Sequence, residues 1–171
     1  GVMGGGCWVP VYECRVSAMP FNQVGPGYQR PLDQTELAGF AYWDMAGPVT
    51  VAIRSSRPIE SVVVRPLAAG IEPRVERDHI RFELDRPRQL VVEVNGPHNA
   101  LHLFACPPEK GAPRADAEGV RYFGPGVHQA GKITLESNQT VYLAAGAVVY
   151  GSIQAQGAEN IAVRGLSLIP I

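Results

Sequence analysis

The stretch GKITLESNQTVYLAAGAVVYGSIQAQGAENIAV, residues 131–163, decides how the C-terminal part of this chain folds. Apolar residues recur along it: Ile133 returns as Ile153, and the pair Val141 and Leu143 returns as Ile161 and Val163. The interval is roughly twenty residues, which lies in the range of solenoid repeats. Apolar segments this short cannot bury their side chains alone, so the pattern predicts coils that stack on one another.

Small or turn-forming residues separate these apolar segments, as corners between short strands require: Gly131, Ser137, Asn138, Gly146, Gly151, Gly157 and Gly165. At such a corner the amide of Asn138 is expected to hydrogen-bond the backbone. The pattern predicts the first coils of a right-handed parallel β-helix over residues 119–171. One alternative stays open, in which this segment adds a further pair of hairpins to the domain that precedes it.

Upstream of residue 107 the pattern changes to strict alternation of apolar and polar residues. Strands are predicted at 49–54, 61–65, 80–84, 90–94 and 101–105, with a tight hairpin turn at Asn95-Gly96. Before them, 9–16 and 40–43 are expected to be strands, 20–31 a loop, and 33–37 a helical turn capped by Asp33. Evenly spaced short strands predict an antiparallel β-sandwich over 1–106, followed by a polar linker at 107–118.

Composition narrows the functional classes. The chain has 171 residues, 46% of them hydrophobic, and a net charge of -1, which predicts a packed core and argues against nucleic acid as a partner. No apolar run is long enough to span a membrane, and the first six residues do not have the pattern of a signal peptide. The three cysteines lack a Cys-x-x-Cys pair and are expected to be free thiols, although a pairing of Cys7 with Cys14 stays open. No cofactor and no metal are expected.

The segments 122–128, 131–135 and 137–151 resemble the entry into the β-helix of pectinase-like glycosidases. The resemblance is to glycoside hydrolase family 28, the polygalacturonases, and to family 49, dextranase and isopullulanase, in which a β-sandwich precedes the helix. It implies polysaccharide degradation, with a pectin-like or α-glucan polysaccharide or oligosaccharide as the partner. The catalytic aspartates of these families lie on later coils, and no segment here matches their motifs. The chain is therefore expected to be the accessory and capping portion of such an enzyme, without catalytic residues of its own.

Two other functions stay open: a free-standing carbohydrate-binding module, and a structural protein that assembles through β-helical coils. Self-association through the last coil, residues 163–171, is expected in either case because its apolar edge has no neighbour. The location stays open between an extracytoplasmic compartment and the cytoplasm.

Hydrolysis of a glycosidic bond needs two carboxylates across it. Glu83 with Asp85 and Asp33 with Glu36 are close in sequence, but they are expected to lie on a solvated strand face and in a turn. His98 and His102 do not have the spacing of metal ligands.

The candidates for sugar contact are Tyr28, Gln29, Arg30, Trp43 and His128. Aromatic faces stack on sugar rings, while Arg and Gln donate directional hydrogen bonds, and an Arg also suits an acidic sugar such as a uronate. Tyr28, Gln29 and Arg30 rank first because a loop rich in Pro and Gly gives them no packing role. The alternative for Trp43 is a place in the core, and for His128 a structural hydrogen bond to the backbone of the first coil.

Overall fold

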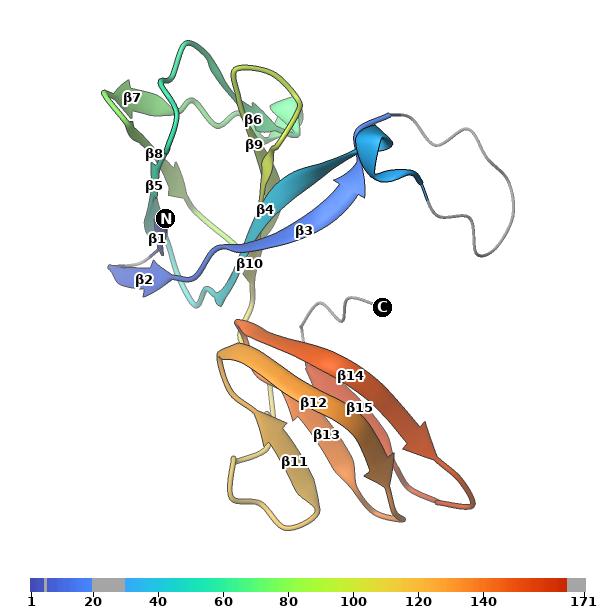
Figure 1. Ribbon diagram of the computed structural model, residues 1–171. Helices are drawn as coiled ribbons and strands as arrows, with labels where there is room; N and C mark the ends of the chain where they lie inside the picture. Colours follow the sequence, from blue (N-terminus) through green and yellow to red (C-terminus); the bar gives the residue numbers. More distant parts are fainter. Residues whose placement is uncertain (5, 20–29, 166–171) are drawn as a thin grey trace. The chain divides into compact units, whose positions relative to one another are not determined.

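The computed structural model describes residues 1–4, 6–19 and 30–165. Within them the chain is all-β, with strands β1 to β15 and two single-turn 3-10 helices, which confirms the all-β prediction. It divides into two compact units (Figure 1). Unit 1 comprises residues 1–41 and 45–105, and unit 2 comprises 42–44 and 106–171. The segment predicted as a linker, 107–118, falls within unit 2.

Two five-stranded sheets are built from the strands that occur up to Cys106. The first has the order β2-β1-β5-β8-β7, with bounds Cys7–Val9, Val2–Gly4, Val49–Arg54, His79–Leu84 and Arg74–Glu76. The second has the order β3-β4-β10-β9-β6, with bounds Tyr12–Ser17, Thr35–Asp44, Leu101–Cys106, Arg88–Val94 and Val62–Arg65. Every pairing whose register the structure defines in these sheets is antiparallel.

Alternation in the sequence becomes alternation of burial in these sheets. Strand β8 alternates buried and exposed residues, and its Ile80 and Phe82 face Ile53 and Val51 of β5 across the sheet. Ile80 and Val51 have no exposed surface. Cross-strand pairs of apolar side chains on one face are what stabilises such a sheet.

The Asn95-Gly96 turn differs from the prediction. Both residues have positive φ, 61° and 117°, but the connection from β9 to β10 runs over 95–100 and is no two-residue turn. The side chain of Asn95 bonds a distant loop instead: its Oδ1 accepts the amide N–H groups of Glu60 and Ser61 at 2.8 and 3.1 Å. Its Nδ2 donates to the carbonyl oxygen of Pro58 at 2.8 Å, so the residue fastens the 58–61 loop and closes no tight hairpin.

The helical turn predicted at 33–37 is wrong in its extent: the 3-10 helix η1 spans Leu32–Gln34 and residues 35–37 already belong to β4. Asp33 lies inside η1, and Pro31 occupies the cap position. A second 3-10 helix, η2, spans Leu67–Ala69. The sequence patterns missed β1 and β7, since strands of three residues are too short to show a period. The loop predicted at 20–31 lies largely outside the described residues.

Unit 2 contains parallel strands. Strands β11, β13 and β15, with bounds Val120–Phe123, Thr140–Leu143 and Ala162–Gly165, form one parallel sheet in that order. Strands β12 and β14, Gly126–Leu135 and Ala147–Ala155, form a second parallel pair. Figure 1 shows these strands lying side by side, so that segments far apart in sequence become neighbours.

The registers test the predicted repeat. Ile133 pairs with Ile153, as predicted, at a spacing of twenty residues. Val141, however, pairs with Val163 and not with Ile161, since the β13–β15 register is offset by twenty-two. Between β12 and β14 the offset changes at Ala130, where the register shifts. The repeat is thus real but uneven.

The corner before β13 has a counterpart before β15, twenty-two residues later in the chain. Asn138 and Asn160 both adopt left-handed backbone, with φ of 64° and 55°. Asn160 Nδ2 donates to Asn138 Oδ1 at 3.2 Å, and the Ser137 hydroxyl oxygen accepts the N–H of Glu159 at 3.0 Å. The sequence predicts that the Asn138 amide bonds the backbone. Its oxygen instead accepts from Asn160, the equivalent asparagine of the next corner.

A continuous apolar cluster fills unit 2, formed by Ile133, Leu135, Val141, Leu143, Ala147 and Val149. Beside it, Gly151 lies directly against the backbone of Gly131, its register partner. A Cβ atom at Gly151 would overlap the carbonyl oxygen of Gly131, and backbone cannot move aside as the end of a side chain can. This position therefore requires glycine.

The substitution Gly151→Ala is expected to destabilise unit 2 by about 1–3 kcal/mol, the usual cost of overpacking. Gly124→Ala serves as the control, because its new methyl would make only an ordinary contact with the Tyr122 ring at 3.7 Å. Chemical denaturation of both variants checks this. Equal midpoints for the two would contradict the close approach of Gly131 and Gly151.

Candidate functional site

A group of ionisable side chains surrounds Glu109 in unit 2. Strand β4 supplies Tyr42 and Asp44 at its end, and β10 supplies Cys106. The parallel sheet supplies Tyr142 from β13 and Arg164 from β15. We call these six residues, Tyr42, Asp44, Cys106, Glu109, Tyr142 and Arg164, the Glu109 cluster.

Strand register explains why the parallel sheet contributes these residues. Tyr122, Tyr142 and Arg164 are register partners across β11, β13 and β15, so they form a ladder on one face of the sheet. The rings of Tyr122 and Tyr142 stack with centroids 5.4 Å apart. The alternate residues Val141 and Leu143 point the other way, into the core, because successive side chains of a strand face opposite sides.

Glu109 binds this ladder. Its Oε1 accepts from Arg164 Nη2 at 2.6 Å and from Arg164 Nε at 3.2 Å, and Arg164 Nη2 also donates to the carbonyl oxygen of Gly111 at 3.1 Å. The side chains of Arg164 and Glu109 are 41% and 24% exposed, so we assign the ion pair no more than about 1 kcal/mol. The contacts fasten the 107–118 segment to the third parallel strand.

Burial and neighbouring groups raise the pKa of four members of the cluster, Tyr42, Asp44, Cys106 and Tyr142. Burial, followed by the hydrogen bond to Glu109, raises the pKa of Tyr142 to about 12. Burial raises the pKa of Tyr42 as well, with Cys106 and Asp44 adding to the effect. Burial and then the Glu109 carboxylate raise the pKa of Asp44, while burial and then Asp44 raise that of the Cys106 thiol.

This arrangement offers phenol donors and carboxylate acceptors side by side. Glu109 Oε2 is buried and has no hydrogen-bond partner among the described residues. Asp44 and Glu109 interact, but Glu109 is already engaged by Arg164 and Tyr142. The geometry fits the anchoring of a segment better than a pair of carboxylates placed across a scissile bond. Among the described residues, no group of three or more His, Cys, Asp or Glu side chains could hold a metal ion.

Of the residues predicted from sequence to contact sugar, Arg30 belongs to unit 1, whereas Trp43 and His128 belong to unit 2. Tyr28 and Gln29 lie outside the described residues. Arg30 is partly buried, and its Nη1 donates to Gln34 Oε1 at 3.2 Å. Trp43 is 8% exposed, with its indole N–H buried and without a partner among the described atoms, which agrees with the alternative of a core residue.

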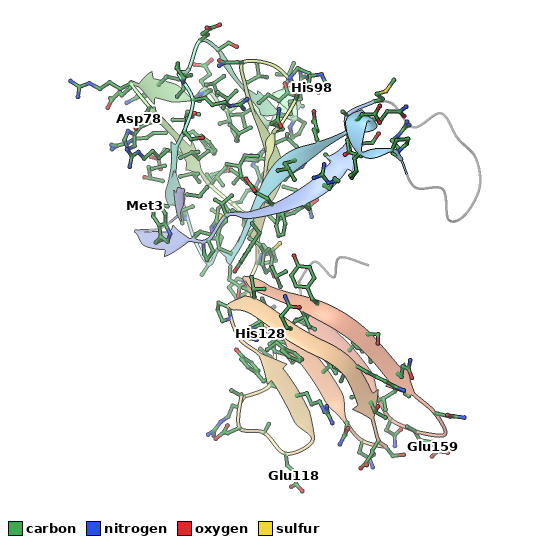
Figure 2. The ribbon with its side chains drawn as sticks, viewed as in Figure 1. Met3, Asp78, His98, Glu118, His128 and Glu159 are labelled. Atoms are coloured by element: carbon green, nitrogen blue, oxygen red, sulfur yellow. The ribbon has the colours of Figure 1, made fainter. Side chains whose placement is uncertain are left out.

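His128 lies on β12, as Figure 2 shows, and its Nε2 is 2.7 Å from the carbonyl oxygen of Gly124. Its ring meets that of Phe123 edge-on, with centroids 5.3 Å apart. This contact is the backbone bond expected of a structural residue. Sugar contact at Arg30, Trp43 and His128 stays a prediction.

Sequence reasoning missed Glu109, Tyr142 and Arg164. Glu109 lies in a polar segment that has the composition of a linker, and Tyr142 and Arg164 meet only through a register of twenty-two residues. The signal that was present is the polar-tipped Tyr142 between the apolar Val141 and Leu143, with Tyr122 and Arg164 at the matching places of β11 and β15.

Comparison with solved structures finds a protein of similar fold. The chain is similar to Dex49A from Penicillium minioluteum. The two share 18% sequence identity with a TM-score of 0.55, over 85% of this chain and 42% of the other. The chain thus spans less than half the length of that protein, and at this identity the likeness shows the fold alone. No family model and no curated protein sequence matches the chain. Among the described residues, no helix is long and apolar enough to cross a membrane.

The Glu109 cluster makes stability depend on alkaline pH. The pKa of Tyr142 is raised to about 12 in the folded chain. An unfolded tyrosine titrates near about 10, so this contribution is complete below that pH and is lost as pH rises through about 12.

Glu109→Gln removes the charge that helps to raise the pKa of Tyr142. We expect the variant to lose less stability than the parent between about pH 10 and about pH 12, measured by urea denaturation at each pH. Glu118→Gln is the matched control, because Glu118 is exposed and lies in the same unit (Figure 2). An identical pH dependence in Glu109→Gln and the parent would show that Glu109 does not act on Tyr142.

Proposed function

We propose that this chain is the N-terminal portion of a polysaccharide-degrading glycoside hydrolase. In this proposal the two antiparallel sheets form a β-sandwich, and unit 2 forms the first coils of a right-handed parallel β-helix. The observation that carries the proposal is the parallel stacking of β11 on β13 on β15, and of β12 on β14, at offsets of twenty to twenty-two residues. Offsets of that size match the coil length of a solenoid.

Two further findings support it. The segments that resemble families 28 and 49, within residues 122–151, include β12, β13 and part of β14. The fold of most of the chain also occurs in Dex49A. The resemblance directs the substrate toward pectin-like polysaccharides or α-glucans.

The chain contributes structure to the proposed enzyme and no catalytic pair. Glu109 interacts with Arg164 and Tyr142. A catalytic role for its carboxylate would require breaking those contacts. Catalytic aspartates on later coils, as in the resembling families, would complete the site. The apolar cluster of unit 2 supplies a rigid base on which such coils stack.

Reducing-sugar release tests the proposal. The product of the whole reading frame that encodes these residues is expected to hydrolyse at least one of pectin, polygalacturonate, dextran and pullulan. The 171-residue chain alone is expected to release no sugar from any of them, because the catalytic aspartates are proposed to lie on later coils and Glu109 of the cluster is paired with Arg164.

Either of two results would overturn the proposal. One is failure of the whole product on every polymer. The other is release by the 171-residue chain that disappears in Asp44→Asn or Glu109→Gln, which would turn the Glu109 cluster into an active site. Both variants keep the shape of the side chain they replace, so a retained unfolding transition separates loss of chemistry from loss of fold.

Self-association through the predicted last coil, residues 163–171, of which 166–171 lie outside the described residues, is a second candidate property. Strand β15 is at the edge of its sheet among the described strands, and Ile161 and Val163 are 40% and 50% exposed. An apolar strand edge of this kind favours pairing with a further strand. Sedimentation velocity over a range of concentrations checks it, and a monomer at every concentration would contradict it.

A further inference from the structure

A cationic cleft lies at one end of the first sheet, within unit 1. Its walls are the loop that follows β5 and the turn between β7 and β8, where Figure 2 shows Asp78. The cleft has a volume of about 610 Å³, within the range of small-molecule and sugar sites. Three arginines line it, Arg54, Arg57 and Arg77, together with a single acidic side chain, that of Asp78.

The single carboxylate is already occupied. Asp78 Oδ2 accepts from Arg54 Nε at 2.9 Å, and Asp78 Oδ1 lies 2.7 Å from His79 Nδ1. Arg57 and Arg77 have no acidic partner among the described residues. Three guanidinium groups against one carboxylate leave the cleft with two uncompensated positive charges.

The backbone that carries these charges is fixed before any ligand arrives. The hydroxyl of Ser55 donates to the carbonyl oxygen of Arg57 at 2.8 Å and accepts the Arg57 N–H at 3.1 Å. The Ser55 N–H donates to the carbonyl oxygen of Asp78 at 2.8 Å, which ties the two walls together. Asn95 fastens the end of the same loop through Pro58. Binding therefore needs to order the arginine side chains and little else.

We propose that this cleft binds the acidic groups of a polyanionic glycan, either the carboxylates of uronate residues or sulfate esters. Both groups present coplanar oxygen pairs to a guanidinium, which donates two parallel hydrogen bonds to them. Neutral sugars offer no charge to match Arg57 and Arg77. The inference rests on the proposed function, because it takes the ligand to be a polysaccharide. It adds a binding site separate from the catalytic site that is proposed on later coils.

Affinity electrophoresis of the 171-residue chain tests the cleft, with polygalacturonate, dextran sulfate or uncharged dextran in the gel. Retardation is expected with at least one polyanion, and added salt should weaken it, since exposed charges are screened. Retardation by polygalacturonate alone would identify carboxylates as the ligand, and retardation by dextran sulfate alone would identify sulfates.

The double variant Arg57→Gln with Arg77→Gln is expected to bind the polyanion roughly tenfold more weakly, the usual effect of losing charge-assisted hydrogen bonds. Arg86→Gln removes one exposed positive charge from the turn after β8, outside the cleft, and is expected to leave affinity nearly unchanged. Comparison of unfolding midpoints shows that all variants remain folded.

Two results would overturn the inference: no retardation by either polyanion, or equal retardation of the parent and the double variant. Either would leave the proposed function untouched if the whole product still hydrolyses a polymer. The opposite pair of results is also distinguishable. If the cleft binds polyanions but the whole product hydrolyses none of the polymers, the binding site is supported and the proposed hydrolase activity is wrong.

Discussion

In-register stacking of apolar side chains is the constraint on which unit 2 depends. Each parallel strand covers the one before it, so that Ile133 meets Ile153 and Val141 meets Val163. No single coil has enough apolar surface to bury itself. The stacking in turn dictates the corners, where Gly151 must lie against Gly131 and Asn160 against Asn138. The residue types at Gly151 and Asn160 are thus set by the alignment of the apolar side chains, although neither residue contributes to the apolar cluster.

The same register generates the polar face. When Val141 and Leu143 point inward, Tyr142 must point outward, and Tyr122 and Arg164 follow on the neighbouring strands. This face is then covered by the segment that carries Glu109, whose carboxylate meets Arg164. The raised pKa values of Tyr42 and Tyr142 follow from this cover, since burial is the first cause in both. The electrostatics of the cluster are therefore a product of strand geometry.

Sequence reasoning succeeded where one period dominates. Strands β5 and β8 were predicted within one residue because alternation over six residues leaves no other interpretation. It failed where a residue is used by a distant segment, as Asn95 is by the 58–61 loop, and where a spacing changes, as it does between Val141 and Val163. The Glu109 cluster and the cationic cleft could not be predicted either, since their members meet only in the folded chain. Among the predicted sugar contacts, Trp43 shows the limit of composition: a tryptophan suits a binding platform and a core equally.

The uneven coil length has an evolutionary consequence. Offsets between stacked strands vary from twenty to twenty-two. The changes fall in the connection at 144–146, at Ala130 and in the corner that ends at Asn160, while the apolar strands keep their alignment. Residues can therefore enter or leave the corners without disturbing what is buried beneath them. In a lineage of such chains, insertions and deletions should concentrate at these bends, so that the corners diverge in length and sequence while the strands between them change slowly.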